Sequence, residues 1–94
     1  MIRWDWTVPR QSVRAVLDPV RPLDGRLRAK LRAHAAVLVS IMRARSHACV
    51  AEDVALAVKE LTEALYGYTD LPMVALAEDV RILLDAVDPD GGAL

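Results

Sequence analysis

Only a few side chains in this 94-residue chain could do chemistry, and they lie far apart. His47 and Cys49 are separated by one residue, and Asp53 follows four residues after the cysteine. These residue types bind zinc in other proteins, but no regular spacing links the three. The single cysteine excludes an internal disulfide and a cysteine zinc knuckle. We therefore predict no metal site and no cofactor.

Two pairs of acidic residues, Glu60 with Glu63 and Glu78 with Asp79, are the other candidates for chemistry. Catalytic carboxylates need a pocket that gives the two groups different environments. Both pairs fall beside the apolar stripes of their helices, so we predict that they face solvent. The sequence has no Gly-rich phosphate loop and no set of nucleophile, base and acid. A small helical enzyme with an arginine-lined pocket is therefore the least favoured class of function.

His34 could act as a switch, because the charge of a histidine changes near neutral pH. It lies on the apolar seam of a predicted helix, which has no second histidine at helical spacing. A histidine satisfied in the core or at its rim is the interpretation we favour. We keep His34 as a candidate switch.

Basic residues on the same helix could bind an anionic partner. Arg28, Arg32 and Arg43 share one flank, and phosphate binding needs such a footprint. The helix has no Asn or Gln to read a base edge, and ten acidic residues fill the second half of the chain. A nucleic-acid-binding transcriptional regulator that uses this flank is thus our alternative function.

Apolar periodicity predicts the elements that position these groups. Five residues of the central stretch recur at steps of three and four, which favours an amphipathic helix over about 25–45; they are Leu27, Leu31, His34, Leu38 and Ile41. A shorter helix begins at Thr7. A third has Glu52 and Asp53 in its first turn and ends before Gly67, which can turn left-handed without strain. A fourth has Pro72 in its first turn, and its apolar seam is Met73, Leu76, Val80, Leu83 and Val87. Because the connections are short, we predict an all-α, up-down bundle of three long helices plus a short N-terminal helix.

The domain plan follows from the length and the ends of the sequence. Residues 1–6 form an N-terminal leader, residues 7–88 a single helical-bundle domain, and residues 89–94 a disordered tail. Trp4 and Trp6 in the leader either close the end of the core, which we favour, or anchor a partner. No apolar run reaches the roughly 20 residues needed to span a bilayer, and the start lacks a signal-peptide core. We expect a cytoplasmic protein with no membrane partner.

Small residues on the second helix suggest a contact with another chain. Ala29, Ala33, Ala36 and Ser40 form a ridge opposite the leucine seam. The ridge is either an exposed alanine face with good helix propensity or a second contact, with the first helix or with another copy. Three apolar residues off their seams, Val39, Val74 and Ile82, favour the second contact. We predict a homodimer that uses Ala33 and Ala36.

The charges of the two halves differ sharply. Residues 1–45 carry a net charge of +7, and residues 46–94 carry −8. We predict that the basic flank of the second helix faces the acids of the third and fourth helices, so that the charges cancel within the chain. If the flanks point apart, each copy is dipolar and can pair with a second copy or with another anionic partner.

Two segments carry a resemblance to a known family. The stretches LRAHAAVLVSIM (Leu31–Met42) and LAEDVRILLD (Leu76–Asp85) resemble the histidine-containing helix and the last helix of a family of small, uncharacterised, all-helical actinobacterial proteins. That family is associated with natural-product biosynthesis. The resemblance implies a helical fold and carries over no catalytic residue. Together, these observations predict a non-enzymatic protein–protein interaction module, an adaptor or small regulator, that forms a homodimer.

Overall fold

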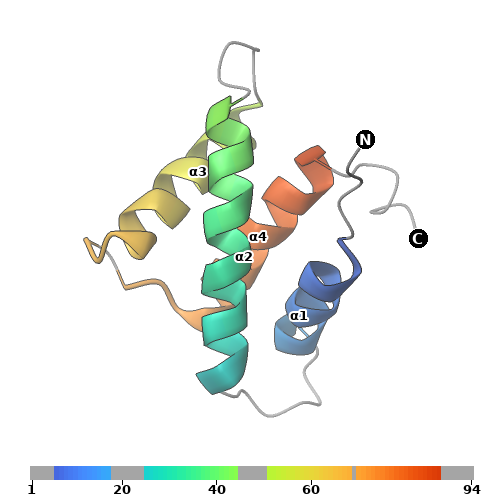
Figure 1. Cartoon of the computed structure of the whole chain (residues 1–94). Helices are drawn as coiled ribbons and strands as arrows, with labels where there is room; N and C mark the ends of the chain where they lie inside the picture. The colour runs from blue at the N-terminus through green and yellow to red at the C-terminus, as the bar shows by residue number, and fades with distance from the viewer. Residues whose placement is uncertain (1–5, 18–24, 45–50, 69, 88–94) are drawn as a thin grey trace.

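The computed structural model describes residues 6–17, 25–44, 51–68 and 70–87. These residues form four α-helices and no strand, which confirms the all-α fold class (Figure 1). The helices are α1 (Thr7–Leu17), α2 (Gly25–Ala44), α3 (Glu52–Leu65) and α4 (Met73–Val87). Trp4, His47, Cys49 and the predicted tail 89–94 lie outside the described residues.

The ends of α3 show why the chain changes direction where it does. Glu52 and Asp53 occupy its first turn, where negative charge suits the helix dipole. After the last turn, Gly67 has a φ of 82°, a left-handed conformation that glycine adopts without strain. The amide of Gly67 donates to the Ala64 carbonyl (3.2 Å) and that of Tyr68 to the Glu63 carbonyl (2.9 Å). This Schellman arrangement confirms the predicted role of Gly67.

Helices α2 and α4 form the centre of the molecule. Each of them packs against all three other helices, whereas α1 and α3 do not contact each other. Figure 1 shows α1 on one side of α2 and α3 on the other. A helix that is covered from two sides must bury more of its circumference than a single seam.

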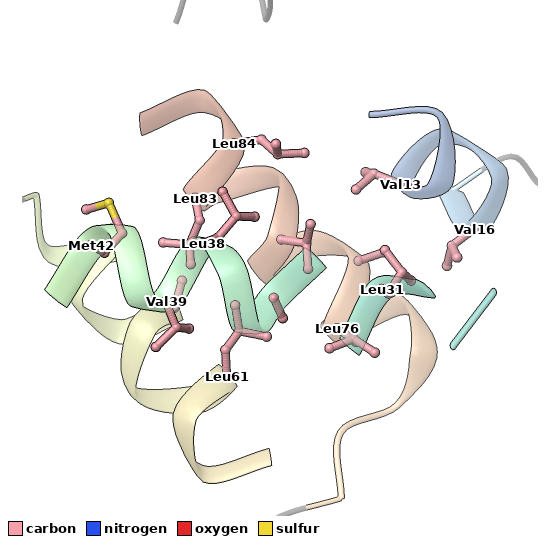
Figure 2. Packing of buried hydrophobic residues seen from close by; sticks show 14 residues of the cluster. Val13, Val16, Leu31, Leu38, Val39, Met42, Leu61, Leu76, Leu83 and Leu84 are labelled. Carbon is pink, nitrogen blue, oxygen red and sulfur yellow. The ribbon is translucent and has the colours of Figure 1, made fainter. Parts of the chain in front are cut away.

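The core is aliphatic and lies between these helices. Figure 2 shows the cluster of buried side chains. The largest fully buried residues are Leu31, Leu38, Leu61, Val80, Leu83 and Leu84. Burying one such side chain stabilises a fold by about 1.5–3 kcal/mol, so this cluster is the main source of stability.

The seam predicted for α2 is correct only in part. Leu31 and Leu38 are fully buried, but His34 is only half-buried. Val39, which we expected outside the seam, is 6% exposed and belongs to the core. That prediction is wrong because α2 meets α1 on one side and α3 with α4 on the other, so its buried arc is wider than the seam. None of the described helices is long and apolar enough to cross a membrane.

Candidate binding groove between α1 and α4

One flank of α1 faces α4 and carries two arginines. Arg10, Arg14 and Leu17 are spaced four and three residues apart, so they share a side of the helix next to buried Val13. On α4 the residues Arg81, Leu84 and Asp85 have the same kind of spacing. All seven line one cavity between the two helices, of about 410 Å³.

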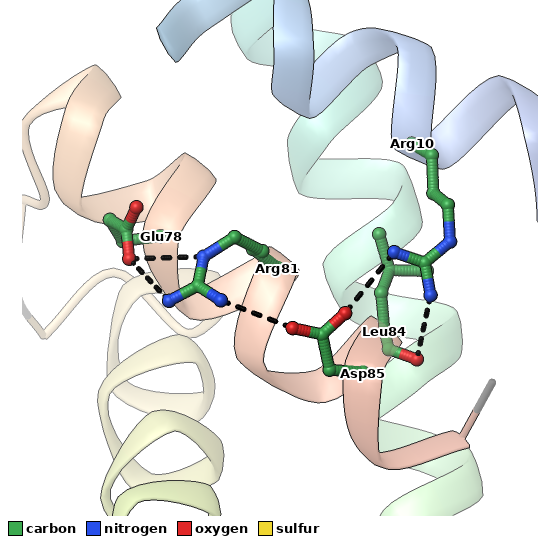
Figure 3. A network of polar contacts seen from close by, with 5 residues as sticks. All are labelled: Arg10, Glu78, Arg81, Leu84 and Asp85. Carbon is green, nitrogen blue, oxygen red and sulfur yellow. Dashed lines mark hydrogen bonds and ion pairs between the residues drawn. The ribbon is translucent and has the colours of Figure 1, made fainter. Parts of the chain in front are cut away.

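Asp85 organises the charged wall of this groove (Figure 3). Nη1 of Arg10 lies 3.2 Å from Oδ1 of Asp85, and Nη2 of Arg10 donates to the Leu84 carbonyl at 3.5 Å. The Arg10 side chain is only 16% exposed, so this ion pair is partly shielded from water. Arg10 also places a positive charge at the C-terminal end of α4, where the helix dipole favours a cation.

Arg81 approaches the same carboxylate from the other side. Its Nη1 donates to Oδ2 of Asp85 at 3.1 Å, while Nε and Nη2 donate to Oε2 of Glu78 at 3.2 and 2.9 Å. The hydrogen bond to Glu78 is the main cause of a raised pKa for Arg81. Two arginines are thus held at fixed positions around one shared aspartate.

The lining of the groove suits a ligand that is both acidic and aliphatic. Val13, Leu17 and Leu84 supply apolar surface, and three arginines against one aspartate give the charged part a positive balance. Arg14 is exposed and has no hydrogen bond or ion pair with the part of the chain that the structure describes. Arg14 is therefore available to bind a carboxylate from another molecule.

The sequence did not single out this groove. Its residues come from two helices whose relative rotation is set by packing, and no local pattern reports that rotation. The available signal was the matching spacing of charged residues on α1 and α4. An arginine-lined pocket was expected only for the least favoured class, a small enzyme, and no catalytic set lies in this lining.

The predicted basic flank of α2 is only partly compensated within the chain. Nη1 of Arg28 donates to the Leu71 carbonyl at 3.0 Å and lies 3.9 Å from Oδ1 of Asp70, so Arg28 faces the connection between α3 and α4, not an acid within either helix. Arg32 and Arg43 have no hydrogen bond or ion pair with any described residue. The predicted cancellation of charge is therefore seen at Arg28 and not along the whole flank.

The small-residue ridge of α2 is exposed within one chain. Ala29, Ala33, Ala36 and Ser40 are all exposed, so α1 does not cover the ridge. The ridge remains either a free alanine face or a contact with another copy.

Trp6 is partly buried and packs against the core, as the favoured interpretation predicts.

His34 faces α1, not a ligand cavity. Its Nε2 atom lies 3.5 Å from Oγ of buried Ser12. Burial lowers the pKa of His34, and the nearby positive charge of Lys30 lowers it further. The ring is therefore neutral at pH 7, which agrees with a histidine at the rim of the core.

Asp79 contradicts the prediction that both acidic pairs face solvent. It is 7% exposed, and its Oδ2 atom is buried without a hydrogen-bond partner. Burial raises the pKa of Asp79 to about 6, with smaller contributions from the charges of Glu60 and Glu78. The prediction failed because α4 packs against α3 as well as α1 and α2, so its buried arc extends to Asp79.

No group of three metal-binding side chains occurs within residues 6–17, 25–44, 51–68 and 70–87. Because His47 and Cys49 lie outside these ranges, the predicted lack of a metal site stays a prediction.

Comparison with protein-family models, with curated proteins and with solved structures found no match to the chain. The resemblance of Leu31–Met42 and Leu76–Asp85 to an actinobacterial family thus rests on those residues alone.

Proposed function

We propose that this chain is a non-enzymatic helical protein–protein interaction module, an adaptor or small regulator of the cytoplasm, and that it acts as a homodimer of up-down bundles. The observation that supports this proposal is the set of charges left without partners on both halves. Arg14, Arg32 and Arg43 lack partners on α1 and α2, and Glu52 and Glu60 lack them on α3, counted over the described residues. A second copy supplies the opposite charge for each set.

The exposed apolar residues support the same proposal. Leu56 is 55% exposed and Val37 40% exposed, on helices whose other leucines and valines largely pack inward. Single exposed apolar residues are ordinary, but Leu56 lies one helical turn from Glu52 and Glu60, and an apolar residue with charges around it resembles the centre and rim of a protein interface.

The alternative, a nucleic-acid-binding regulator, uses the flank of Arg28, Arg32 and Arg43. Phosphate binding depends on several neighbouring cations. Arg28 is already held by the Leu71 carbonyl and Asp70, and the helix surface beside this flank is the alanine ridge. This arrangement favours a protein partner over a polyanion.

Size-exclusion chromatography with light scattering tests the proposal. At micromolar concentration we expect twice the 10.3 kDa mass of one chain. A mass of one chain at every concentration would overturn the homodimer. Retention on a DNA column that is strong at low salt and lost at high salt would support the alternative.

A further inference from the structure

The outer face of α3 presents a leucine surrounded by acids. Leu56 is 55% exposed, although it lies in the middle of the helix. Its neighbours at three and four residues in each direction are Glu52, Asp53, Lys59 and Glu60. This acidic leucine face thus has an apolar centre and a net negative rim.

The α1/α4 groove has the opposite character. Its apolar part is built by Val13, Leu17 and Leu84, and its charged part is dominated by Arg10, Arg14 and Arg81. Arg10 and Arg81 are fixed by Asp85, so the cost of ordering them has already been met within the monomer. Of these three arginines, Arg14 has no hydrogen bond or ion pair with a described residue.

We propose that the acidic leucine face of one copy docks in the α1/α4 groove of a second copy. Leu56 packs on the apolar lining, and the acids around it pair with Arg14 and the other arginines of the rim. This inference rests on the proposed homodimer and names its contact surfaces.

The topology requires that this contact form between copies. Helices α1 and α3 do not contact each other, and both are separated by the central pair α2 and α4. The groove of a chain therefore cannot receive the Leu56 face of the same chain. A two-fold arrangement, in which each copy donates its Leu56 face and receives that of the other, is the one that closes the dimer.

The groove is partly open to solvent, which favours a segment of a large partner over a small molecule. Pockets for small ligands bury most of the ligand surface. The alanine ridge of α2 is the competing contact, but it offers exposed small side chains and no unpaired charge of its own. It therefore serves as the alternative outcome of the experiment.

Two single variants test the contact. Leu56→Lys places a cation against the arginine rim, and Arg14→Glu places an acid against the acidic leucine face. Both side chains are exposed, and neither residue has a polar partner among those described, so the monomer should keep its helicity by circular dichroism. We expect each variant to weaken dimerisation at least tenfold in sedimentation or light scattering. Val8→Lys and Lys30→Glu, which make the same kinds of change at exposed residues outside both surfaces, should leave it unchanged.

Mixing the two variants gives the decisive result. In a mixed dimer the new lysine of Leu56→Lys faces the new glutamate of Arg14→Glu, and the other contact is native. The mixture should therefore dimerise more strongly than either variant alone. If wild-type dimers survive both substitutions but dissociate with Ala33→Glu, the groove contact is wrong and the homodimer stands. If the wild-type chain is a monomer at every concentration, both proposals fail.

Discussion

Two aspartates of α4, six residues apart, have opposite surroundings. Asp85 is half-exposed and accepts hydrogen bonds from Arg10 and Arg81, so its charge is compensated twice. Asp79 is 7% exposed, and Glu60 and Glu78 oppose its ionisation. The comparison shows that a carboxylate is stabilising where a neighbouring helix supplies a cation, and costly where the neighbour supplies another acid.

The largest expected effect comes from removing the unfavourable aspartate. At pH 7 the ionised Asp79 opposes folding, because its pKa is raised from 3.8 to about 6. Replacing it by leucine removes that cost and adds apolar surface to the α3–α4 contact. We expect Asp79→Leu to raise the free energy of unfolding by about 2 kcal/mol, measured by urea denaturation. A destabilised variant would show that Asp79 has a partner that its surroundings do not indicate.

The second prediction concerns Arg10, which stabilises the other aspartate, Asp85. Its side chain is 16% exposed and satisfies both Asp85 and the Leu84 carbonyl. Arg10→Ala should lower the free energy of unfolding by about 1.5 kcal/mol, because two partly shielded acceptors lose their donor. Arg14→Ala, on the same flank but without a described partner, is the matched control and should change stability by less than about 0.5 kcal/mol. Equal effects of the two substitutions would contradict the assigned network.

The sequence predicted much of the fold and little of the groove, for a physical reason. Helix limits follow from local chemistry, and Gly67 ends α3 as predicted. The seam of α4 was also correct at Leu76, Val80 and Leu83. Those patterns depend on one helix at a time.

The failures all concern rotation of one helix against another. Val39 was placed outside the seam and Asp79 toward solvent because a periodic stripe marks one buried side of a helix, whereas α2 and α4 are covered from several sides. The groove of Arg10, Arg14 and Asp85 exists only because α1 and α4 turn those flanks toward each other. Periodicity fixes which residues share a face, but packing decides what that face meets.

The pH dependence of stability sharpens the comparison further. Folding raises the pKa of Asp79, so the folded chain binds this proton more tightly than the unfolded chain does. Its contribution to stability is therefore largest below about pH 4, and it is lost as the pH rises through about 6. We expect wild type to gain about 1 kcal/mol relative to Asp79→Asn between pH 7 and pH 5. Taking the difference between the two proteins removes the contributions of the other acids, and parallel pH profiles would contradict the buried state of Asp79.

The smallest expected effect is at Arg81, whose several hydrogen bonds contribute little to stability because they are exposed to solvent. Arg81 donates hydrogen bonds to both Glu78 and Asp85 (Figure 3), yet its side chain is 44% exposed and these partners are each 43% exposed. Exposed pairs at three and four residues along a helix contribute only about 0.3–0.5 kcal/mol each, and salt screens them. Arg81→Ala should therefore lower the stability of the monomer by no more than about 0.5 kcal/mol at low salt, and by less at 1 M salt. Because Arg81 also lines the groove, the measurement is best made in the Leu56→Lys background, which separates folding from dimerisation. A loss as large as that of Arg10→Ala would mean that Arg81 contributes as much as Arg10 to holding Asp85, and that burial of the arginine side chain is not what distinguishes the two.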